Sequence, residues 1–597
     1  MREYSTPPNV VIPDTGSLTD DLLRHAHETP ERPLFARRTS PTDSWIEVSA
    51  REFLDQVQGV AAGLIASGVT PGDRVALLSK TRYEWTLIDY ANWYVGAVTV
   101  PIYETSSDEQ VAWILQDSGA KAIIVESSIH LSRVQSLRAQ LPALEHVWAF
   151  CDDAVETIGQ LGVGIPPDTV ESRRAGVLPT DPATLIYTSG TTGKPKGCVL
   201  THENFMFELG TTTTTLHELF DHDDAATLLF LPLAHVFARI IQVGCMKTGA
   251  RMGHSSDIKS LVDDLASYQP TFILAVPRVF EKIFNTSSQR AVADGKGKVF
   301  DRAAKVAIQY SRALDKGRPS PALAVQHRIF DKLVYAKLRQ ALGGKCTFAL
   351  SGGAPLGERL GHFYRGMGVP ILEGYGLTET TAALTVNLPD ELKIGSVGRP
   401  LPGTAVRVAD DGELLFQGGQ VFHGYWQDDS ATAEAFDDGW FKTGDLGEID
   451  DEGFVRITGR KKEIIVTAGG KNVAPGVLED RMRAHPLVDQ VLVVGDGRPF
   501  IAALITLDRE SLREWATARG KSTQLRDLLN DPDVLSEIDA AVTDTNTAVS
   551  RAESIRKYEI LRDEWTEEAG HLTPSLKLRR NVVRRKYADA IESLYTH

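Results

Sequence analysis

The stretch that decides the interpretation of this chain is a loop rich in glycine, threonine and lysine, Tyr187-Thr188-Ser189-Gly190-Thr191-Thr192-Gly193-Lys194-Pro195-Lys196-Gly197. It directly follows the apolar run 183–187, which has the composition of a buried strand. Glycines let backbone N–H groups turn toward an anion, hydroxyls add donors, and lysines add compact positive charge. The loop therefore predicts a site that wraps a polyphosphate.

Two other interpretations of this loop are weaker. A Walker A loop is excluded, because no Gly-x-x-x-x-Gly-Lys-Ser/Thr spacing can be fitted to it. A surface linker can also be rich in Gly and Thr, but it would rarely carry Lys-Pro-Lys-Gly directly after a buried strand. Phosphate binding remains the favoured interpretation.

Composition and charge limit the class of protein. At 597 residues the chain is long enough for more than one domain, and 42% hydrophobic with 24% charged residues is ordinary for a globular protein. The formal net charge of −15 argues against nucleic acid as the main partner, because such binding needs a positive field. An anionic ligand in a locally basic cleft is compatible with this charge.

No targeting or membrane-spanning segment is predicted. Residues 1–14 lack the apolar core of a signal peptide, and the most apolar stretch, 226–246, is interrupted by Pro232 and Arg239. The four cysteines are far apart without a Cys-x-x-Cys pair, which disfavours zinc and favours reduced thiols. We expect a cytoplasmic protein, monomeric or homodimeric, and leave peripheral contact with the inner face of the cell membrane open.

Short β-branched runs alternate with helical patterns in the first half of the chain. We predict strands at 75–78 and 97–102 and helices at 83–94 and 108–117. Such alternation is typical of parallel sheets covered by helices, in which ligands bind at the carboxyl ends of strands. The loop that follows residue 187 would lie at such an end.

The C-terminal part of the chain has a different pattern. Short β runs and turns begin near Val406, and a compact segment of strands and one helix follows residue 460. We therefore predict a large N-terminal domain, residues 1–460, and a small α+β domain, residues 461–597. The stretch 295–340, rich in Ala, Lys, Arg and Leu, is predicted to form two helices on the main domain.

A cluster at 372–380 places two glycines around an aromatic residue, followed by a hydroxyl and a carboxylate. Tyr375 could lie against a purine, Thr378 could donate to a phosphate, and Glu379 could hold Mg²⁺, which prefers oxygen ligands. An ordinary glycine turn with a capping carboxylate explains the cluster about equally well.

Three later clusters are weak singly. Asp445 in a glycine turn could accept the ribose hydroxyls of a nucleotide, although a plain turn aspartate is the simpler explanation. Arg460 suits hydroxyl or phosphate contacts. Lys577 sits in a loop before a basic stretch, 584–586, that is best explained as a solvated helix face. All of these motifs in this order, after the phosphate loop, form a strong combination.

Together the motifs resemble those of the acyl-adenylate-forming ligases, which include acyl-CoA synthetases, luciferases and peptide synthetase adenylation domains. The resemblance covers about 22–595 and is greatest to long-chain fatty acyl-CoA synthetases with an actinobacterial character, through segments 231–239, 276–283 and 572–580. It implies an α/β fold. The large N-terminal domain would contain layered sheets and helices with a distorted β-barrel subdomain, and the small C-terminal α+β domain would be mobile.

The resemblance implies ATP- and Mg²⁺-dependent activation of a long-chain fatty acid to acyl-AMP, followed by transfer to coenzyme A. Lys577 would be the adenylation lysine, Thr378 the contact to the α-phosphate, and Glu379 the Mg²⁺ ligand. Asp445 and Arg460 would hold the ribose. The other residues implied to contact ATP are Thr188, Ser189, Gly190, Thr191, Thr192, Gly193, Lys194, Lys196, Gly352, Gly353, Ala354, Pro355, Glu373, Gly374, Tyr375 and Gly376.

The transfer step implies a second set of residues. Lys462 would be the hinge about which the small domain rotates, and Gly469, Gly470 and Lys471 would then face coenzyme A. His235, after a Pro-Leu-Ala turn, would shape the carboxylate end of the acyl tunnel; a hydrogen-bonded core histidine explains it equally well.

The chain departs from the common family pattern at three positions. Leu576 stands where many relatives have glycine before the lysine, and Glu463 stands where many have aspartate. Arg239 lies near a position at which some bacterial members carry a gating tryptophan, so the sequence leaves the tunnel gate unassigned.

Two other functions remain open at this stage. A fatty acyl-AMP ligase that loads a carrier protein usually carries an insertion that obstructs domain rotation, and no extra segment precedes Arg460. A catalytically inactive acyl- or nucleotide-binding homologue is disfavoured because Lys577, Glu379 and Asp445 are all present.

Overall fold

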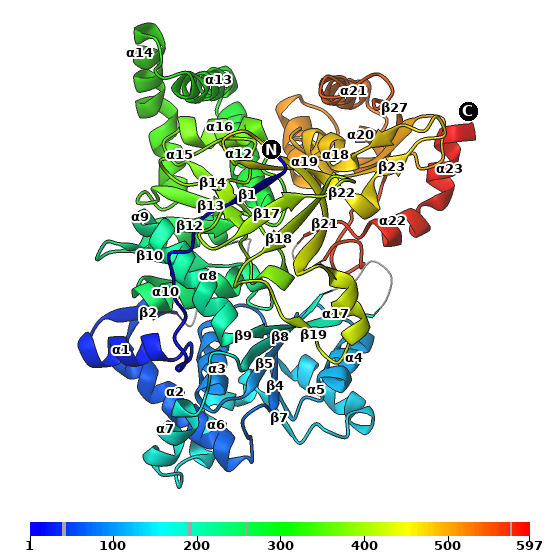
Figure 1. The fold of residues 1–597 in the computed structure, drawn as a ribbon. Helices are drawn as coiled ribbons and strands as arrows, with labels where there is room; N and C mark the ends of the chain where they lie inside the picture. Colours follow the sequence, from blue (N-terminus) through cyan, green and yellow to red (C-terminus); the bar gives the residue numbers. More distant parts are fainter. Residues whose placement is uncertain (39–42, 189–193, 258–259, 574–575, 597) are drawn as a thin grey trace.

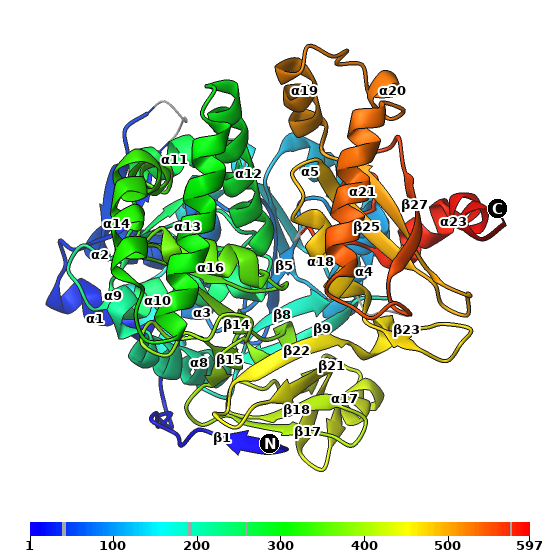
Figure 2. The ribbon, with the colours of Figure 1, turned by 90° about the horizontal axis from the view of Figure 1, so that it is seen from above.

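The computed structural model describes residues 1–597 except 39–42, 189–193, 258–259, 574–575 and 597. A large N-terminal part of layered sheets and helices carries a smaller C-terminal part at one side (Figure 1). Seen from above, the orange and red C-terminal part stands beside the green helices of the N-terminal part (Figure 2). The predicted α/β fold with a large and a small part is confirmed.

The predicted alternation of strands and helices forms a mixed sheet with the order β19-β9-β8-β5-β4-β6-β7. The strands from β8 to β7 run parallel; β9 is antiparallel to β8, and β19 is antiparallel to β9. Its elements are β4 (Arg74–Leu78), α3 (Tyr83–Tyr94), β5 (Val98–Ile102), α4 (Asp108–Ser118), β6 (Ala122–Val125), α5 (Ser128–Leu137), β7 (His146–Ala149), β8 (Pro182–Thr188), β9 (Lys196–Thr201) and β19 (Gly424–Tyr425).

A second sheet has the order β12-β13-β14-β15-β16, parallel over its first three strands. Its elements are β12 (Phe272–Ala275), α12 (Pro277–Ala293), β13 (Phe348–Ser351), α16 (Glu358–Gly366), β14 (Ile371–Tyr375), β15 (Thr385–Val386) and β16 (Arg399–Pro400). The glycine turn after β13 therefore lies at a carboxyl end, like the phosphate loop after β8.

A third sheet and its helices comprise β10 (Ala226–Leu229), β11 (Arg251–His254), β2 (Pro33–Arg37), β3 (Ile46–Ser49), α8 (His202–Thr215), α9 (His217–Phe220), α10 (Val236–Thr248) and α11 (Leu261–Tyr268).

Further helices cover the N-terminal part: α1 (Asp20–Glu28), α2 (Ala50–Ala66), α6 (Ala154–Leu161) and α7 (Pro167–Ala175). The stretch 295–340 forms α13 (Gly297–Asp315) and α14 (Pro321–Phe330), broken at Gly317, whose φ of 107° no ordinary helix residue adopts. The second predicted helix has the expected extent, but it is not one regular α-helix: α14 continues through a π-helical turn (Asp331–Tyr335) into α15 (Ala336–Ala341).

The expected distorted β-barrel is wrong. The strands that begin after residue 404 form an open sheet with the path β1-β17-β18-β21-β20, and β22 also pairs with β21. Both β20 and β22 pair with the long strand β21, at different positions along its length. The strands therefore do not close into a ring. Its elements are β1 (Glu3–Ser5), β17 (Ala405–Val408), β18 (Glu413–Gln417), α17 (Asp429–Ala435), β20 (Phe436–Asp437), β21 (Trp440–Ile449) and β22 (Val455–Arg460).

The C-terminal part has its own hydrophobic cores, which begin at Ile465. Its elements are β23 (Ile465–Val466), β24 (Asn472–Val473), α18 (Pro475–Arg483), β25 (Val488–Val494), β26 (Ile501–Leu507), α19 (Arg509–Ala518), α20 (Leu525–Leu528), α21 (Pro532–Asn546), β27 (Ile555–Ile560), α22 (Arg580–Lys586) and α23 (Ala588–Thr596). The predicted strands and first helix are present, and the sequence analysis missed α19, α21 and β27. The domain boundary at 460/461 stays a prediction.

A buried polar network holds the centre of the N-terminal part. Helix α3 is buried nearly all round, so its polar residue Asp89 must find partners inside. The Arg239 guanidinium of α10 donates to Asp89 Oδ1 and to Thr184 Oγ1 of β8, each at 2.5 Å, and Gln242 donates to Asp89 Oδ2 at 2.9 Å. Both members of the ion pair are 0% exposed. Arg239 therefore ties α3, β8 and α10 together and does not line the cavity described below.

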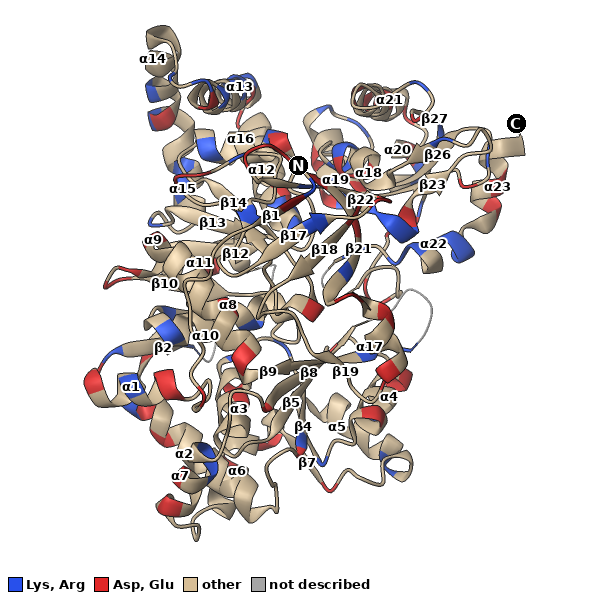
Figure 3. Cartoon of the chain, in the orientation of Figure 1, with Lys and Arg blue, Asp and Glu red and all other residues tan. Residues whose placement is uncertain are grey.

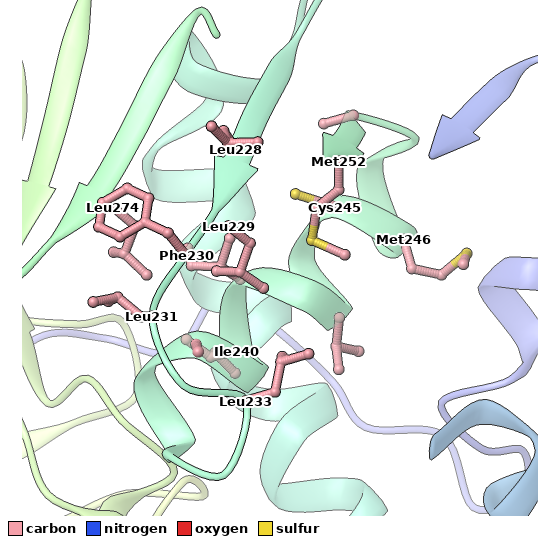
Figure 4. Close-up of a cluster of buried hydrophobic side chains, with 14 of the residues drawn as sticks. Leu228, Leu229, Phe230, Leu231, Leu233, Ile240, Cys245, Met246, Met252 and Leu274 are labelled. Atoms are coloured by element: carbon pink, nitrogen blue, oxygen red, sulfur yellow. The ribbon is translucent and has the colours of Figure 1, made fainter. Parts of the chain in front are cut away.

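Apolar side chains close the region around α10. Leu229, Leu233 and Ile240 gather around the segment that joins β10 to α10, with Leu274 of β12 beside them (Figure 4). None of the helices in the part of the chain that the structure describes combines the length and apolar character needed to cross a membrane.

We predict that Arg239→Leu lowers the free energy of unfolding by about 3–5 kcal/mol, because it leaves the Asp89 carboxylate buried without its cation. Arg251→Leu is the matched control: its pairing with Glu47 is partly exposed, and its loss should cost about 1 kcal/mol or less. Equilibrium unfolding in denaturant measures both. Equal losses in the two variants would contradict a central role for the buried pair.

Candidate active site

A cavity of about 990 Å³ lies where the carboxyl ends of β8, β13 and β14 meet β21, β22 and the loop after β27. Most of the residues that the sequence analysis singled out line it. They are Thr188, Lys194, Lys196, His235, Gly352, Gly353, Gly374, Tyr375, Gly376, Thr378, Glu379, Arg460, Lys462 and Lys577. The structure thus brings together residues from six separate segments of the chain.

Other predicted residues do not line this cavity. Ala354 and Pro355 are exposed on the outer part of the turn after β13. Ser189, Gly190, Thr191, Thr192 and Gly193 lie outside the described residues.

Two aromatic residues support the lysines of the phosphate loop. Lys194 Nζ lies 3.9 Å from the ring centroid of Trp113, whose indole N–H donates to Pro195 O at 2.9 Å. Lys196 Nζ lies 5.3 Å from the ring centroid of Tyr425 and 3.7 Å from the Asp428 carboxylate. The loop therefore leaves β8 with its cations held beside the cavity, as anion binding requires. The sequence analysis missed Trp113 and Tyr425, because each lies far along the chain from the loop.

Glu379 is the carboxylate of the cavity whose surroundings fit a Mg²⁺ ligand. It accepts a hydrogen bond from the Tyr425 hydroxyl at 2.9 Å, which uses one of its oxygens. Among the described residues no group of three or more His, Cys, Asp and Glu is placed to hold a metal. A single carboxylate beside phosphate-binding lysines matches the way Mg²⁺ is commonly held, by one or two carboxylates together with substrate phosphates.

Asp445 lies behind the cavity wall as part of a hydrogen-bonded set. It accepts from the Tyr375 hydroxyl at 2.7 Å, and Arg460 Nε lies 3.4 Å from its other oxygen. Burial raises the pKa of Asp445, against the opposing effects of the Arg460 cation and the Tyr375 hydrogen bond. The contact orients the Tyr375 ring at the cavity edge and keeps Arg460 beside it.

Glu373 has a supporting position. Its side chain does not line the cavity; Oε1 accepts from the backbone N–H of Leu356 at 3.1 Å. Burial raises its pKa to about 7. Glu373 therefore braces the turn after β13 from behind.

Lys577 lies at the meeting point of the two parts of the protein. A Cβ added at Gly353 would lie 4.0 Å from Lys577 Cε, so the lysine side chain lies directly against the turn after β13. The Lys577 side chain faces the cleft and is surrounded by protein. The resulting loss of hydration is the main cause that lowers the pKa of Lys577, and the nearby Arg460 cation is the second. Asp445, Glu463 and Glu379 oppose that shift.

The residue before this lysine has a strained backbone. Leu576 has a φ of 61°, in the left-handed region that glycine adopts without cost. Leu576 is the residue that stands where many relatives have glycine. Its left-handed backbone conformation explains why glycine is common at this position. Lys577 is held by a hydrogen bond from its own N–H to Thr573 Oγ1 at 3.0 Å.

His235 is the N-cap of α10. Its Nδ1 accepts from the Phe237 N–H at 3.2 Å, which leaves Nε2 to carry the proton. Burial, with the Lys577 cation second, lowers the pKa of His235 to about 3. The residue therefore lines the cavity as a neutral imidazole that can donate from Nε2.

Lys462 lies between two residues, Lys461 and Glu463, that form ion pairs with different parts of the protein. Lys461 Nζ contacts Asp411 at 2.5 Å and Glu413 at 2.9 Å, both in the β17–β18 region of the N-terminal part. Glu463 accepts from Arg580 Nε at 3.1 Å in the C-terminal part. The chain between these two anchors consists of Lys462 alone, in a short turn of 3-10 helix.

The loop of Gly469, Gly470 and Lys471 lies outside the cavity. Gly470 is held within its own turn by a hydrogen bond to Thr467 O at 2.8 Å, and Lys471 pairs with Glu553 at 3.2 Å. In this arrangement Lys577 lines the cavity, whereas Gly469, Gly470 and Lys471 do not.

Helices α8 and α9 and the residue between them line one end of the cavity and add residues that the sequence analysis missed. Glu208, Thr212, Leu216 and Phe220 line the cavity at intervals of four, so one face of α8 and α9 changes from polar to apolar along its length. Burial raises the pKa of Glu208 well above its ordinary value, so its carboxyl is neutral. No hydrogen-bond partner for its Oε2 is found among the described residues.

Comparisons with known proteins agree with this arrangement. The family model described as "AMP-binding enzyme" matches residues 22–426, and the model "AMP-binding enzyme C-terminal domain" matches residues 462–597. The chain belongs to the AMP-binding enzyme family. The resemblance to an actinobacterial long-chain acyl-CoA synthetase is supported by 49% identity to Long-chain-fatty-acid–CoA ligase FadD15 of Mycobacterium bovis, over the whole of both chains.

Solved structures of this family share the fold. The anthranilate CoA ligase AuaEII in complex with anthranoyl-AMP is 20% identical with a TM-score of 0.74, over 97% of this chain and 99% of that one. The Mycobacterium tuberculosis fatty acyl CoA synthetase is 24% identical with a TM-score of 0.61, over 96% and 99%.

We predict a pH-dependent stability difference for Glu208→Gln. Above the ordinary pKa of 4.5 the unfolded chain releases the Glu208 proton while the folded enzyme keeps it, so stability falls as pH rises, by up to about 1.4 kcal/mol per unit. The amide has no such linkage, so the variant gains stability relative to the parent as the pH rises above the ordinary carboxyl pKa of 4.5. Melting temperatures at a series of pH values above this pKa measure the gain. Glu109→Gln, at an exposed site of α4, is the control, and a constant difference for Glu208→Gln would contradict the assignment.

Proposed function

We propose that this AMP-binding enzyme is a long-chain-fatty-acid–CoA ligase. It would convert a long-chain fatty acid, ATP and coenzyme A to acyl-CoA, AMP and pyrophosphate through an acyl-AMP intermediate. The observation that carries the proposal is the cavity in which Lys577 meets Glu379, Arg460 and the glycine turn after β13, with the apolar side chains of Leu216 and Phe220 in its wall beyond α8. The full-length identity to the mycobacterial relative supports the choice of acid.

The first step joins two anions, because a carboxylate attacks the α-phosphorus of ATP. In our proposal Thr188, Lys194 and Lys196 hold the β- and γ-phosphates, and Thr378 contacts the α-phosphate. Lys577 bridges the carboxylate and the α-phosphate, and this preorganised cation offsets the repulsion. Glu379 would hold Mg²⁺, which would supply further charge neutralisation on the phosphates. Neutral His235 would donate from Nε2 at the carboxylate end of the apolar channel.

The second step requires the coenzyme A thiol to reach the acyl carbon, which Lys577 obstructs in the present arrangement. We propose that the C-terminal part rotates about Lys462, removing Lys577 and bringing Gly469 and Gly470 to the cleft. The anchors on each side support this pivot, because Lys461 is tied to the N-terminal part and Glu463 to the C-terminal part. The domain boundary at 460/461 follows from the same proposal.

The expected site chemistry is tested by Lys577→Ala. Loss of one preorganised donor typically costs about 3–4 kcal/mol, so acyl-AMP formation should slow by roughly 10²–10³. Thioester formation from added acyl-AMP should continue at nearly the parent rate, because Lys577 has left the cleft in that step. The two half-reactions are measured separately by mass spectrometry, and equal loss in both would refute the role.

The hinge is tested by Lys462→Pro, since proline fixes φ and prevents the rotation. Thioester formation should fall much more than acyl-AMP formation. Lys462→Ala is the matched control, because it removes the same side chain but keeps the freedom of the backbone. Lys461→Pro is unsuitable as a control, because it also removes the contacts with Asp411 and Glu413. Similar losses in both steps for Lys462→Pro would remove the hinge assignment.

The reaction itself is tested with palmitate, ATP and Mg²⁺, with and without coenzyme A. Palmitoyl-CoA and AMP are the expected products. Palmitoyl-AMP that persists in the presence of coenzyme A would instead indicate a ligase that loads a carrier protein. Absence of both products with a broad panel of acids would indicate an inactive homologue. Oligomeric state and cellular location remain predictions from the sequence.

A further inference from the structure

An exposed apolar stripe runs along α14 and the π-helical turn that follows it. Val325, Ile329 and Leu333 are 58%, 52% and 56% exposed, and their spacing of four residues places them on one face. Single exposed apolar residues are normal on protein surfaces, but a row of three on one helix face is typical of an interaction site. Figure 1 shows α14 at the outer edge of the N-terminal part, away from the C-terminal part.

The opposite face of α14 is firmly packed, so the stripe is presented outward. His327 stacks on Tyr310 of α13 with ring centroids 3.9 Å apart, and its Nε2–H donates to Gly366 O of α16 at 2.6 Å. In the π-helical turn the Tyr335 hydroxyl donates to Ala303 O of α13 at 2.7 Å. These contacts fix which face of the helix meets solvent.

Positive charge surrounds the stripe. The segment 316–341 contains six lysines and arginines and a single acid, a formal charge of +5 in a chain whose net charge is −15. Arg328, Lys332 and Lys337 are exposed, and within the described residues none of the three forms an ion pair. Figure 3 shows these basic segments along α14 and α15.

We propose that this stripe, Val325, Ile329 and Leu333 with Arg328 and Lys332 at its edge, is a docking surface for an anionic lipid bilayer. A helix with one apolar face and basic flanks lies in the membrane interface, where the apolar side chains enter the acyl boundary and the cations meet lipid phosphates. The long basic side chains can lie along the apolar surface while their charged ends reach the headgroups.

The charge favours a lipid surface over a second copy of the chain. A symmetric contact through this face would bring Arg328 and Lys332 of each copy toward those of the other, and like charges facing each other oppose association. An anionic bilayer instead complements them. The inference does not depend on which acid the enzyme activates.

The test is co-sedimentation of the full chain with vesicles of phosphatidylcholine alone and of phosphatidylcholine with phosphatidylglycerol. The parent should bind the anionic vesicles, more strongly at low salt. Val325→Ser/Ile329→Ser/Leu333→Ser should weaken this binding by at least about tenfold, since it removes the apolar surface that enters the bilayer. Arg328→Gln/Lys332→Gln should weaken it by roughly fivefold per charge and should reduce its salt dependence.

The matched control is Ile129→Ser/Val163→Ser, which removes two apolar side chains, 73% and 80% exposed, from other parts of the surface. It should bind vesicles like the parent. Circular dichroism and thermal unfolding check that each variant is folded. If the triple serine variant does not fold, the binding of the Arg328→Gln/Lys332→Gln variant decides the test. Equal vesicle binding by the stripe variants, the control and the parent would overturn the proposal. So would a parent that ignores vesicles but forms dimers that the stripe variant disrupts.

Discussion

The Arg239–Asp89 ion pair is the interaction on which the arrangement of the N-terminal part depends. It is fully buried, so neither charge can remain there without the other, and it joins α3, β8 and α10 at a single point. Those elements carry the site: β8 leads into the phosphate loop, and α10 begins at His235. A shift of one would move Thr188 and His235, which both line the cavity, relative to each other.

A second constraint acts where the two parts of the protein join. The ion pairs of Lys461 and Glu463 fix the chain on both sides of Lys462, so rotation can concentrate in one residue instead of spreading over a loop. In the arrangement described, Lys577 lines the cavity, whereas Gly469 and Gly470 do not. In the proposed reaction, the same geometry would favour acyl-AMP formation and exclude the thiol from the acyl carbon.

Sequence reasoning was strongest where short-range patterns act. Helix α3 begins and ends at the predicted residues Tyr83 and Tyr94, and β4 and β5 differ from prediction by one residue at one end. Such segments depend on local propensity and burial. It failed where pairing between distant strands decides the result: the expected barrel is an open sheet, because β20 and β22 share β21.

The sequence by itself determined the family, the α/β class and a set of glycine, hydroxyl and charged residues that meet at the cavity, because glycine turns and charged motifs carry their chemistry in local order. Only the tertiary structure decided which of them meet. It assigned Arg239 to the core, turned Glu373 toward a backbone N–H, and placed neutral Glu208 in the cavity wall. Burial and partners depend on segments far apart in the chain, and no local pattern records them.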